Sequence, residues 1–462
     1  MTVEIAQLET YLSSFTTLAD QSAQPTPSWL RDLRENAFVR FCKAGFPTVH
    51  DEDWRFTNLS ALTRIPFRLA RENTHLLAAS DLEVWQIKDA AAQIVFVDGF
   101  FAPHLSSLDA LPNGVRVVGL ARAITDRDQT VCDHLGRYLD IERDPFCALN
   151  TSFIDDGVFL HVKKGAVIAD PIHLLFVSTP HADPAMTHPH NLVVVEAEAQ
   201  ASIVEEYVSW GAPTATLSNA VTELVAGENA TIEHTLIERE NLETYNFSTL
   251  RIQQASSANV TSHSLLLGGA LVRNNVHPVL MGEGAECLIN GLFVGKHSQH
   301  LDNYMLVEHA SPHCASRQFY NGILDERSRG VFHGRIIVHK DAQKTDAKQT
   351  NRNLLLSDDA QIDTKPQLEI YADDVKCTHG ATIGQIEGSA LFYLRSRGIS
   401  ESDARRILLQ AFAGECIERI SGGVRKYCQA IVAEVLQSIA KPASHQTVDA
   451  RVIKARNGKE IA

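Results

Sequence analysis

The pair of residues best suited to chemistry in this sequence is Cys377 and His379, two positions apart in the segment 373–382 (DDVKCTHGAT). Alternate residues of an extended strand point to the same face, so a thiol and an imidazole at this spacing project together. Both groups are suited to zinc, iron and iron–sulfur centres. Metal signatures use more ligands at fixed spacing, and a free cysteine is usually a small buried residue, so the pair alone does not establish a metal site.

The pair lies where the character of the chain changes, and the sequence divides into three predicted parts. Residues 1–92 read as a helical domain, with a Pro-containing break at 24–27. Residues 93–388 consist mainly of short apolar–polar alternations broken by Gly, Asp or Asn, which are typical of strands. In residues 389–462 the apolar residues recur with the period of an α-helix, about 3.6 residues, and predict a second helical domain.

The strand-rich part contains a recurring phrase, a small residue followed by a β-branched run. Ala201, Ala230, Ala258 and Ala285 mark it, at separations of 29, 28 and 27 residues. A near-constant period of this kind is typical of a β-solenoid, in which each coil stacks on the one before. The alternative, a large sandwich, would show turn signals every ~8–12 residues without long-range registration. The pattern favours the solenoid and leaves its handedness open.

Two helical stripes follow Gly398 and are expected to pack on each other. The first consists of Ala404, Ile407, Leu408, Ala411, Phe412 and Ile417, and the second runs from Val424 to Ile439. Seven Arg and Lys residues crowd this region. They form either a docking face or an ordinary solvated helix surface.

Composition excludes several classes of protein. The 462 residues carry a net charge of -14, so there is no overall basic footprint for nucleic acid. Eight cysteines are scattered without a CxxC pair, which predicts a reducing compartment. The first residues lack a basic secretory n-region, and no run of ~18 apolar residues is present. We therefore expect a cytoplasmic protein that binds neither membrane nor nucleic acid.

Other chemistries are weakly represented. The sequence has no Gly-x4-Gly-Lys-Ser/Thr loop, so the chain is not expected to be an ATPase. A group of histidines and one cysteine between 296 and 320 resembles a metal site, but hydrogen-bonded histidines are the commoner explanation. Solenoids also host carbohydrate-active enzymes with paired carboxylates, for which the candidates are Asp358, Asp359, Asp363 and Glu369.

Several phrases of the sequence resemble the SufB/SufD family of iron–sulfur cluster assembly proteins, and its SufD branch most closely. The specific ones are 341–347 (DAQKTDA), 353–357 (NLLLS), 364–371 (TKPQLEIY), 373–382 (DDVKCTHGAT) and 391–398 (LFYLRSRG). Weaker ones are 54–57 (WRFT), 150–159 (NTSFIDDGVF) and 330–338 (GVFHGRIIV). Gly380 stands where SufB-type members carry Glu, which favours the SufD branch.

The resemblance implies a mainly β fold: a right-handed parallel β-helix flanked by N- and C-terminal helical domains. It also implies a cytoplasmic, non-catalytic scaffold that pairs with SufB through the β-helix and docks the ATPase SufC on its C-terminal helices. A transient iron–sulfur cluster would be shared with SufB. The matching histidine, His379, is implicated at the SufB interface, and Cys377 lies beside it as a second ligand or as a structural thiol.

Four ligands normally hold a cluster, so two ligands in one chain are half a site, which a sister subunit would complete. Two other functions stay open at this point. One is a carbohydrate-active solenoid enzyme, and the other is a SufB-like scaffold that acts as a homodimer.

Overall fold

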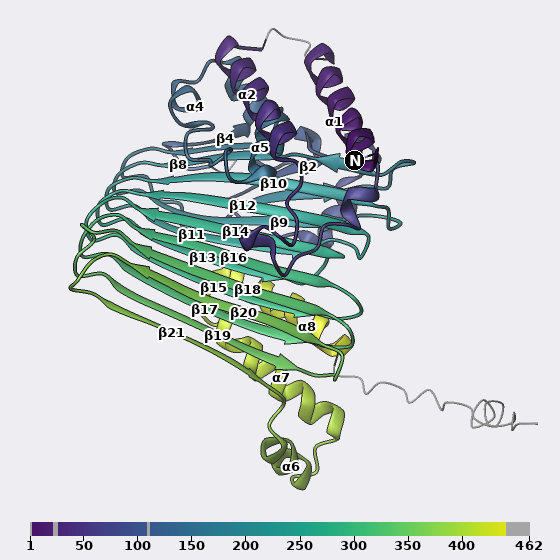
Figure 1. The fold of residues 1–462 in the computed structure, drawn as a ribbon, viewed down its shortest axis with the longest axis vertical. Coiled ribbons are helices and arrows are strands. Elements are labelled where there is room, and N and C mark those ends of the chain that lie inside the picture. Colours follow the sequence, from purple (N-terminus) through teal and green to yellow (C-terminus); the bar gives the residue numbers. More distant parts are fainter. Residues whose placement is uncertain (1, 22–25, 109–110, 440–462) are drawn as a thin grey trace, which may run out of the picture.

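Two long parallel sheets form the body of the molecule. The computed structural model describes residues 2–21, 26–108 and 111–439. Within them, one sheet has the strand order β20-β18-β16-β14-β12-β10-β8-β5-β4 and the other the order β21-β19-β17-β15-β13-β11-β9-β6-β2-β3. Each pass of the chain therefore adds one strand to each sheet, and the result is a β-solenoid of about eight turns (Figure 1). The mainly β fold with flanking helices, predicted from the sequence, is confirmed.

The strands and helices have the following bounds. The strands are β1 (Arg68–Leu69), β2 (Ala92–Val97), β3 (Phe100–Phe101), β4 (Val115–Gly119), β5 (Val158–Val162), β6 (Ile172–Ser178), β7 (Ala185–Thr187), β8 (His190–Val195), β9 (Gln200–Ser209), β10 (Thr216–Ala226), β11 (Thr231–Arg239), β12 (Thr244–Gln254), β13 (Asn259–Leu266), β14 (Leu271–Leu280), β15 (Glu286–Gly295), β16 (His300–His309), β17 (Ala315–Leu324), β18 (Arg329–Val338), β19 (Asp346–Leu355), β20 (Gln361–Ile370) and β21 (Lys376–Gly384). The α-helices are α1 (Thr2–Gln21), α2 (Ser28–Ala44), α3 (Leu120–Thr125), α4 (Gln129–His134), α5 (Pro145–Ser152), α6 (Gly388–Ser396), α7 (Glu401–Ile417) and α8 (Gly422–Ile439).

Small buried residues at one corner of every coil set the period. The residue that follows each corner residue donates its backbone N–H to the carbonyl of the corner residue in the previous coil. Asn259, which follows Ala258, donates in this way to Ala230 O at 2.8 Å. The residue before each takes a positive φ, which turns the chain sharply into the strand. The small residues of this corner column are Ala199, Ala230, Ala258, Ala285, Cys314 and Thr345.

The prediction that Ala201 is a corner residue of the repeat is wrong. Ile232, not Ala230, is the register partner of Ala201, so the first corner is Ala199, two residues earlier. Both alanines are buried and each begins an apolar run, so the local pattern alone could not separate them. The coil from Ala199 to Ala230 is accordingly 31 residues long, since Thr231 N donates to Ala199 O.

The N-terminal region covers the first coils of the solenoid. Aromatic side chains of α1, α2 and the following segment pack against α5 and the sheet, and Trp54 and Phe146 stack at 5.3 Å. Phe146 in turn stacks on Phe247 of β12 at 3.9 Å. The segment between α2 and β2 consists of short 3₁₀ turns and the two-residue strand β1. The N-terminal region therefore covers part of the outer face of this sheet.

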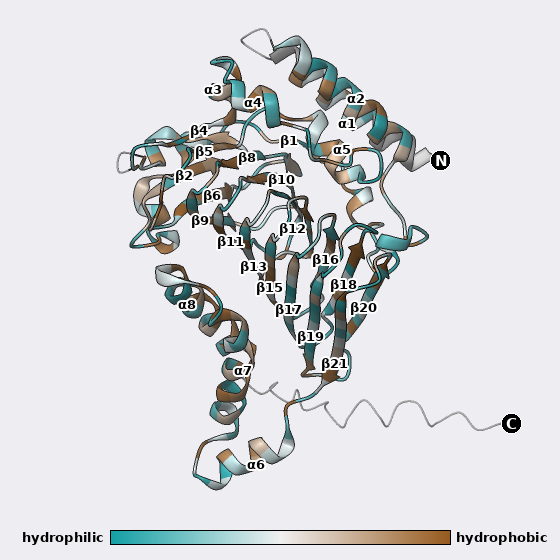
Figure 2. Cartoon of the chain, turned by 90° about the vertical axis from the view of Figure 1, so that its left-hand side faces the viewer, coloured by the Kyte–Doolittle hydropathy of each residue, from teal (hydrophilic) through white to brown (hydrophobic). Residues whose placement is uncertain are grey.

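The C-terminal helices α7 and α8 lie on the outer face of the sheet that ends in β21 (Figure 2). Their apolar residues form one cluster with outward residues of the sheet, among them Val204, Ile237 and Leu292. The part of the predicted C-terminal domain at 440–462 lies outside the described residues.

The predicted stripe of α7 is rotated from the observed one. Leu409, Ala413 and Cys416 are buried, whereas Ile407 is 40% exposed. The two helices contact each other, as predicted from the sequence. α7 packs on the sheet as well, and this turns Leu409 and Ala413 inward in place of Ile407.

In the part of the chain that the structure describes, no helix is long and apolar enough to cross a membrane.

We predict that Leu409→Ala lowers the free energy of unfolding by about 2–5 kcal/mol, because it leaves a cavity between α7 and the sheet. Ile407→Ala, two residues away on the exposed side, should change it by less than about 0.5 kcal/mol. Denaturant unfolding of the two variants measures both values. Equal losses would contradict the observed orientation of α7.

Candidate functional site

Cys377 and His379 both lie on β21, the last strand of its sheet. β21 pairs with β19 alone among the described strands, in parallel register. Cys377 faces Ala347 and His379 faces Gln349 across this ladder. Ala347 and Gln349 are buried inside the solenoid, so register places both candidate residues on the inward face.

The surroundings of the two residues differ. Cys377 is half-buried and packs against the main core, and this burial raises the pKa of its thiol. His379 is exposed, because no later coil covers the inward face of β21. The structure thus brings the pair together on one face, at the uncovered end of the stack.

The interior next to this end is polar. Gln349 Nε2 donates to Gln318 Oε1 at 2.7 Å, and Gln349 Oε1 has no hydrogen-bond partner in the described part of the chain. Asn353 Nδ2 donates to Asn351 Oδ1 at 2.6 Å. Amide side chains on alternate residues of β19 therefore line the inward face directly beneath β21. The alternation Gln349, Asn351, Asn353 was the sequence signal for this lining, and sequence reasoning missed it.

The residues that the structure describes do not by themselves provide a complete metal site. Among the described residues, no group of three or more His, Cys, Asp or Glu side chains is arranged to hold a metal ion. The nearest acids are already paired, Asp346 with Arg317 at 2.6 Å and Asp374 with Lys344. The two candidate residues on β21 would be an incomplete set for a cluster that normally takes four ligands.

Exposed apolar side chains surround the same end of the molecule. Ile370 ends β20 and Tyr371 follows it, Ile383 lies near the end of β21, and Phe392 and Tyr393 lie on α6. Phe392 is 74% exposed, and α6 buries no residue at all. Figure 2 shows α6 beyond the last strands, away from the solenoid. Such a concentration of apolar surface at one end is typical of an interaction site.

The histidines between 296 and 320 do not form a metal site. His300 Nε2 lies 3.0 Å from Thr57 Oγ1, His309 Nε2 lies 2.9 Å from Ser316 Oγ, and His297 pairs with Glu326 at 2.9 Å. Each of these three rings has its own partner on a different element, in line with the commoner explanation of this group.

Two of the four carboxylates considered for carbohydrate chemistry, Asp363 and Glu369, are also engaged. Arg329 binds Asp363 and Arg335 binds Glu369, each through two guanidinium nitrogens. The hydrogen bond from Arg335 lowers the pKa of Glu369. Paired in this way, the two carboxylates are held by arginines and are poor candidates for acid–base catalysis.

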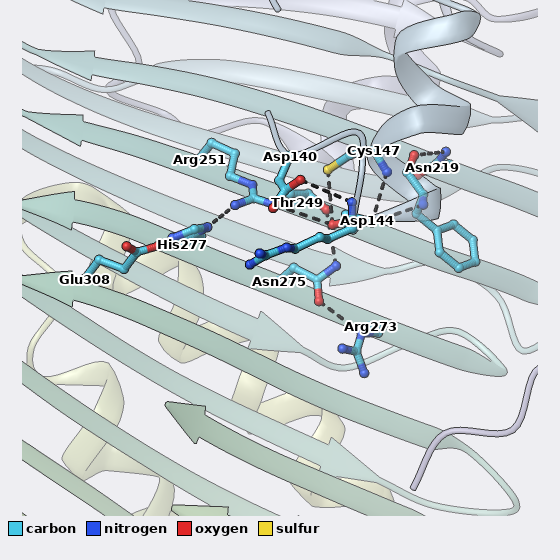
Figure 3. A network of polar contacts seen from close by, with 12 residues as sticks. Asp140, Asp144, Cys147, Asn219, Thr249, Arg251, Arg273, Asn275, His277 and Glu308 are labelled. Carbon is cyan, nitrogen blue, oxygen red and sulfur yellow. Dashed lines mark hydrogen bonds and ion pairs between the residues drawn. The ribbon is translucent and has the colours of Figure 1, made fainter. Parts of the chain in front are cut away.

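A polar network away from β21 connects α5 to the outer face of the other sheet (Figure 3). Asp144 caps α5 and accepts a hydrogen bond from the buried thiol of Cys147 at 3.2 Å. Arg251 lies between Asp144 and His277, and His277 pairs with Glu308 at 2.6 Å. Burial raises the pKa of Cys147 well above its usual value, so this thiol is suited to a structural role.

Comparison with known proteins gives two family matches that together span most of the chain. Residues 176–412 match the family described as SUF system FeS cluster assembly, SufBD core domain. Residues 5–174 match the SufBD protein N-terminal region. The first match includes all strands from β7 to β21 and therefore the candidate pair.

Relatives in three organisms cover most of this chain. An iron–sulfur cluster assembly SufBD family protein of Synechocystis is 35% identical over 85% of this chain and 88% of its own. The iron–sulfur cluster assembly protein SufD of Escherichia coli is 35% identical over 82% of this chain and 86% of its own length. The chloroplastic protein ABCI7 of Arabidopsis thaliana is 30% identical over 86% of this chain and 84% of its own length.

The buried His309 predicts a pH dependence of stability. Burial lowers its pKa to about 4, below the ~6.5 of an unfolded chain. The unfolded state therefore binds more protons between these values. This contribution to stability is full above about pH 6.5 and falls as the pH drops toward 4.

Between pH 7 and pH 5, we expect the free energy of unfolding of the wild type to fall by about 2 kcal/mol more than that of His309→Gln, as measured by urea unfolding. His297→Gln replaces an exposed ring and is the matched control. Its free energy of unfolding should vary with pH as that of the wild type does. Equal slopes for all three proteins would contradict a buried neutral His309.

Proposed function

Because the chain belongs to the SufB/SufD family and is SufD-like, we propose that it is the non-ATPase scaffold subunit of a cytoplasmic SufBCD complex. Its role in iron–sulfur cluster assembly follows from the family itself. The observation that carries the finer proposal is the placement of Cys377 and His379 on an uncovered, inward-facing edge strand.

The proposed SufB contact is the open end of the solenoid. The free side of β21 presents unpaired backbone groups, which a strand of another chain can extend into a continued sheet. A SufB-type subunit placed there would cover Ile383 and bring its own ligands to His379 and Cys377. The cluster is the cargo of this site, and each chain supplies part of its coordination.

The proposed SufC contact is α6 with the adjoining helices. Phe392 and Tyr393 provide exposed apolar area, Arg395 lies on the same short helix, and Arg397 is its C-cap residue. Arg397 lies over the Tyr393 ring at 5.2 Å. Aromatic and arginine side chains of this kind are those that dominate protein interfaces.

The proposed SufC contact at α6 is connected through α7 to the sheet that carries the proposed SufB contact at β21. This connection supports a role for ATP binding by SufC in opening the site. α7 is hydrogen-bonded to the sheet that ends in β21, since Asn321 Nδ2 donates to Phe412 O at 2.8 Å and Cys416 Sγ to Gly291 O at 3.2 Å. Dimerisation of two ATP-bound SufC subunits would pull on α6 and α7 and bias the sheet edge between two arrangements. In one of them the ligands on β21 would be open to iron and sulfide.

The two competing functions fit the molecule less well. A carbohydrate-active enzyme needs free carboxylates in an outer groove, and Asp363 and Glu369 are paired with arginines. A SufB-like homodimer would place two copies of β21 together and would carry Glu rather than Gly380 after the histidine. Copurification with an ABC-type ATPase and bound iron separates the enzyme from the scaffold.

We predict that His379→Ala abolishes cluster formation by the reconstituted complex, because it removes one ligand of the shared site. The measurement is anaerobic reconstitution with both partner subunits, followed by assay of iron and acid-labile sulfide. Thr378→Ala, the outward neighbour on the same strand, is the matched control and should leave cluster formation at the wild-type level.

Size-exclusion chromatography of the complex distinguishes loss of a ligand from loss of assembly. We expect the His379→Ala complex to be intact but without cluster. Wild-type iron and sulfide in an intact His379→Ala complex would remove His379 from the mechanism.

We predict that Phe392→Ala weakens binding of the SufC ATPase by tenfold or more, because it deletes the most exposed aromatic side chain of α6. Val84→Ala removes a similarly exposed apolar side chain from the opposite region of the chain and should leave the affinity unchanged. Calorimetric titration measures both. Equal affinities for the two variants would exclude α6 from the contact.

A further inference from the structure

The chain between the buried residues Ala372 and Ala404 is exposed or half-buried throughout. This stretch contains β21, α6 and their connections. The neighbouring strand of the sheet, β19, buries every second residue over most of its length, and α7 buries five residues. Local opening of a protein costs least where few side chains are buried. The stretch is therefore a region of low local stability between two anchored residues.

α6 has little stability of its own. It is nine residues long, and it contacts α7 without burying any of its own residues. Helices shorter than about 12 residues are marginal in water and depend on tertiary packing, because few hydrogen bonds offset the cost of nucleation. The N-cap residue of α6, Glu387, makes no capping hydrogen bond with its side chain. We therefore expect α6 to unfold easily when no partner covers it.

β21 is weakly held for a different reason. It pairs with β19 on one side only, whereas the inner strands of the sheet pair on both sides. In a solenoid much of the stability comes from contacts between neighbouring coils, so a strand with one neighbour lacks part of that contribution. Gly380 and Gly384 weaken β21 further, because glycine loses much conformational freedom on folding and packs no side chain. A Cβ added at either glycine would meet no described atom within 4 Å, so no close approach of another segment requires them.

Ile386 gives the two elements a common anchor. Only residues 385–387 separate the end of β21 from the start of α6. Ile386 packs against the apolar cluster that α7 and α8 form with the outer face of the sheet. Opening of β21 from its last residue, or of α6 from its first, displaces Ile386, because it lies two residues from either element. Each element therefore helps to keep the other in place.

We propose that β21 and α6 open and close together as one local folding unit seated by Ile386, so that a partner bound to one element stabilises the other. Docking at α6 then orders the strand that carries Cys377 and His379, and covering β21 strengthens docking at α6. Such coupling requires no second rigid conformation, because the first partner supplies ordering that the second then does not have to supply, and it is reciprocal. The use of this unit by SufB- and SufC-type partners rests on the proposed function, whereas the unit itself does not.

Hydrogen exchange of the full-length chain without partners tests the unit. Gly380→Thr places a β-branched residue in open space on β21, at a backbone position that is not left-handed. It should slow exchange of the β21 amides that face β19 by about fivefold. In a single folding unit the α6 amides slow by the same factor. Slower exchange of β21 with unchanged exchange of α6 would overturn the proposal.

The reverse experiment starts from α6. Gly388→Ala favours the helix, because alanine has the higher helix propensity and its side chain enters open space. It should slow the α6 amides and, by the same factor, the β21 amides that face β19. Failure of both substitutions to slow the element that they do not touch would contradict a single unit.

Two further variants separate this unit from general stabilisation. Gly414→Ala favours α7, which is already anchored, and should leave exchange of β21 and α6 unchanged. Ile386→Ala removes the common anchor, so in this background Gly380→Thr should slow β21 alone. Slower exchange of α6 in that double variant would show that the coupling bypasses Ile386 and would overturn the proposed anchor. Exchange of the β13 amides, deep in the stack, shows that each variant is folded.

Calorimetric titration with the SufC ATPase tests the consequence for binding. The Gly380→Thr chain should bind it up to about fivefold more tightly than wild type, although residue 380 lies outside α6. Equal affinities would show that docking does not depend on the order of β21 and would contradict the coupling. Absence of binding to both chains would contradict the proposed SufC contact, and the exchange measurements, which use no partner, would still decide on the folding unit.

Discussion

Each strand of a parallel stack hydrogen-bonds to the coil before it and the coil after it, and each coil covers the inward side chains of its neighbour. The last coil has no successor, so its backbone and its inward face stay uncovered. In this chain β21 is the last strand of its sheet, and no described strand pairs with its free side. Cys377 and His379 lie on the uncovered inward face of β21, so their chemistry depends on what covers it.

The helices that follow β21 couple this end to a second surface. α7 and α8 are part of one apolar cluster with the outer face of the β21 sheet, and Tyr427 of α8 hydrogen-bonds to the buried Glu206 at 2.9 Å. α6 stays outside this cluster with its aromatic residues exposed. The coupling proposed above would pass from α6 to α7, which contacts it, and from α7 to the sheet through its packed side chains and hydrogen bonds.

The repeat, the helices near both ends of the chain and the shared face of Cys377 and His379 were predictable from sequence because each depends on local spacing. The corner at Ala199 was missed, since Ala201 begins an equally good apolar run and only the ladder with β11 decides between them. The rotation of α7 that buries Leu409 was missed because it depends on the sheet face beneath the helix. The place of Gln349 beside His379 depends on the pairing of two strands distant in the chain, which no local pattern brings together.

Hydrogen exchange of the β21 amides tests the central claim most directly, because it reports whether the open edge is covered. In a parallel ladder, alternate residues direct their amides to one neighbour, and Lys376 N donates to Thr345 O on the β19 side. The amides of Cys377, His379, Ala381 and Ile383 therefore face the free edge. We predict fast exchange of these four in the isolated chain and strong protection in the complex with a SufB-type subunit. Unchanged exchange at these positions in an assembled complex would contradict the account.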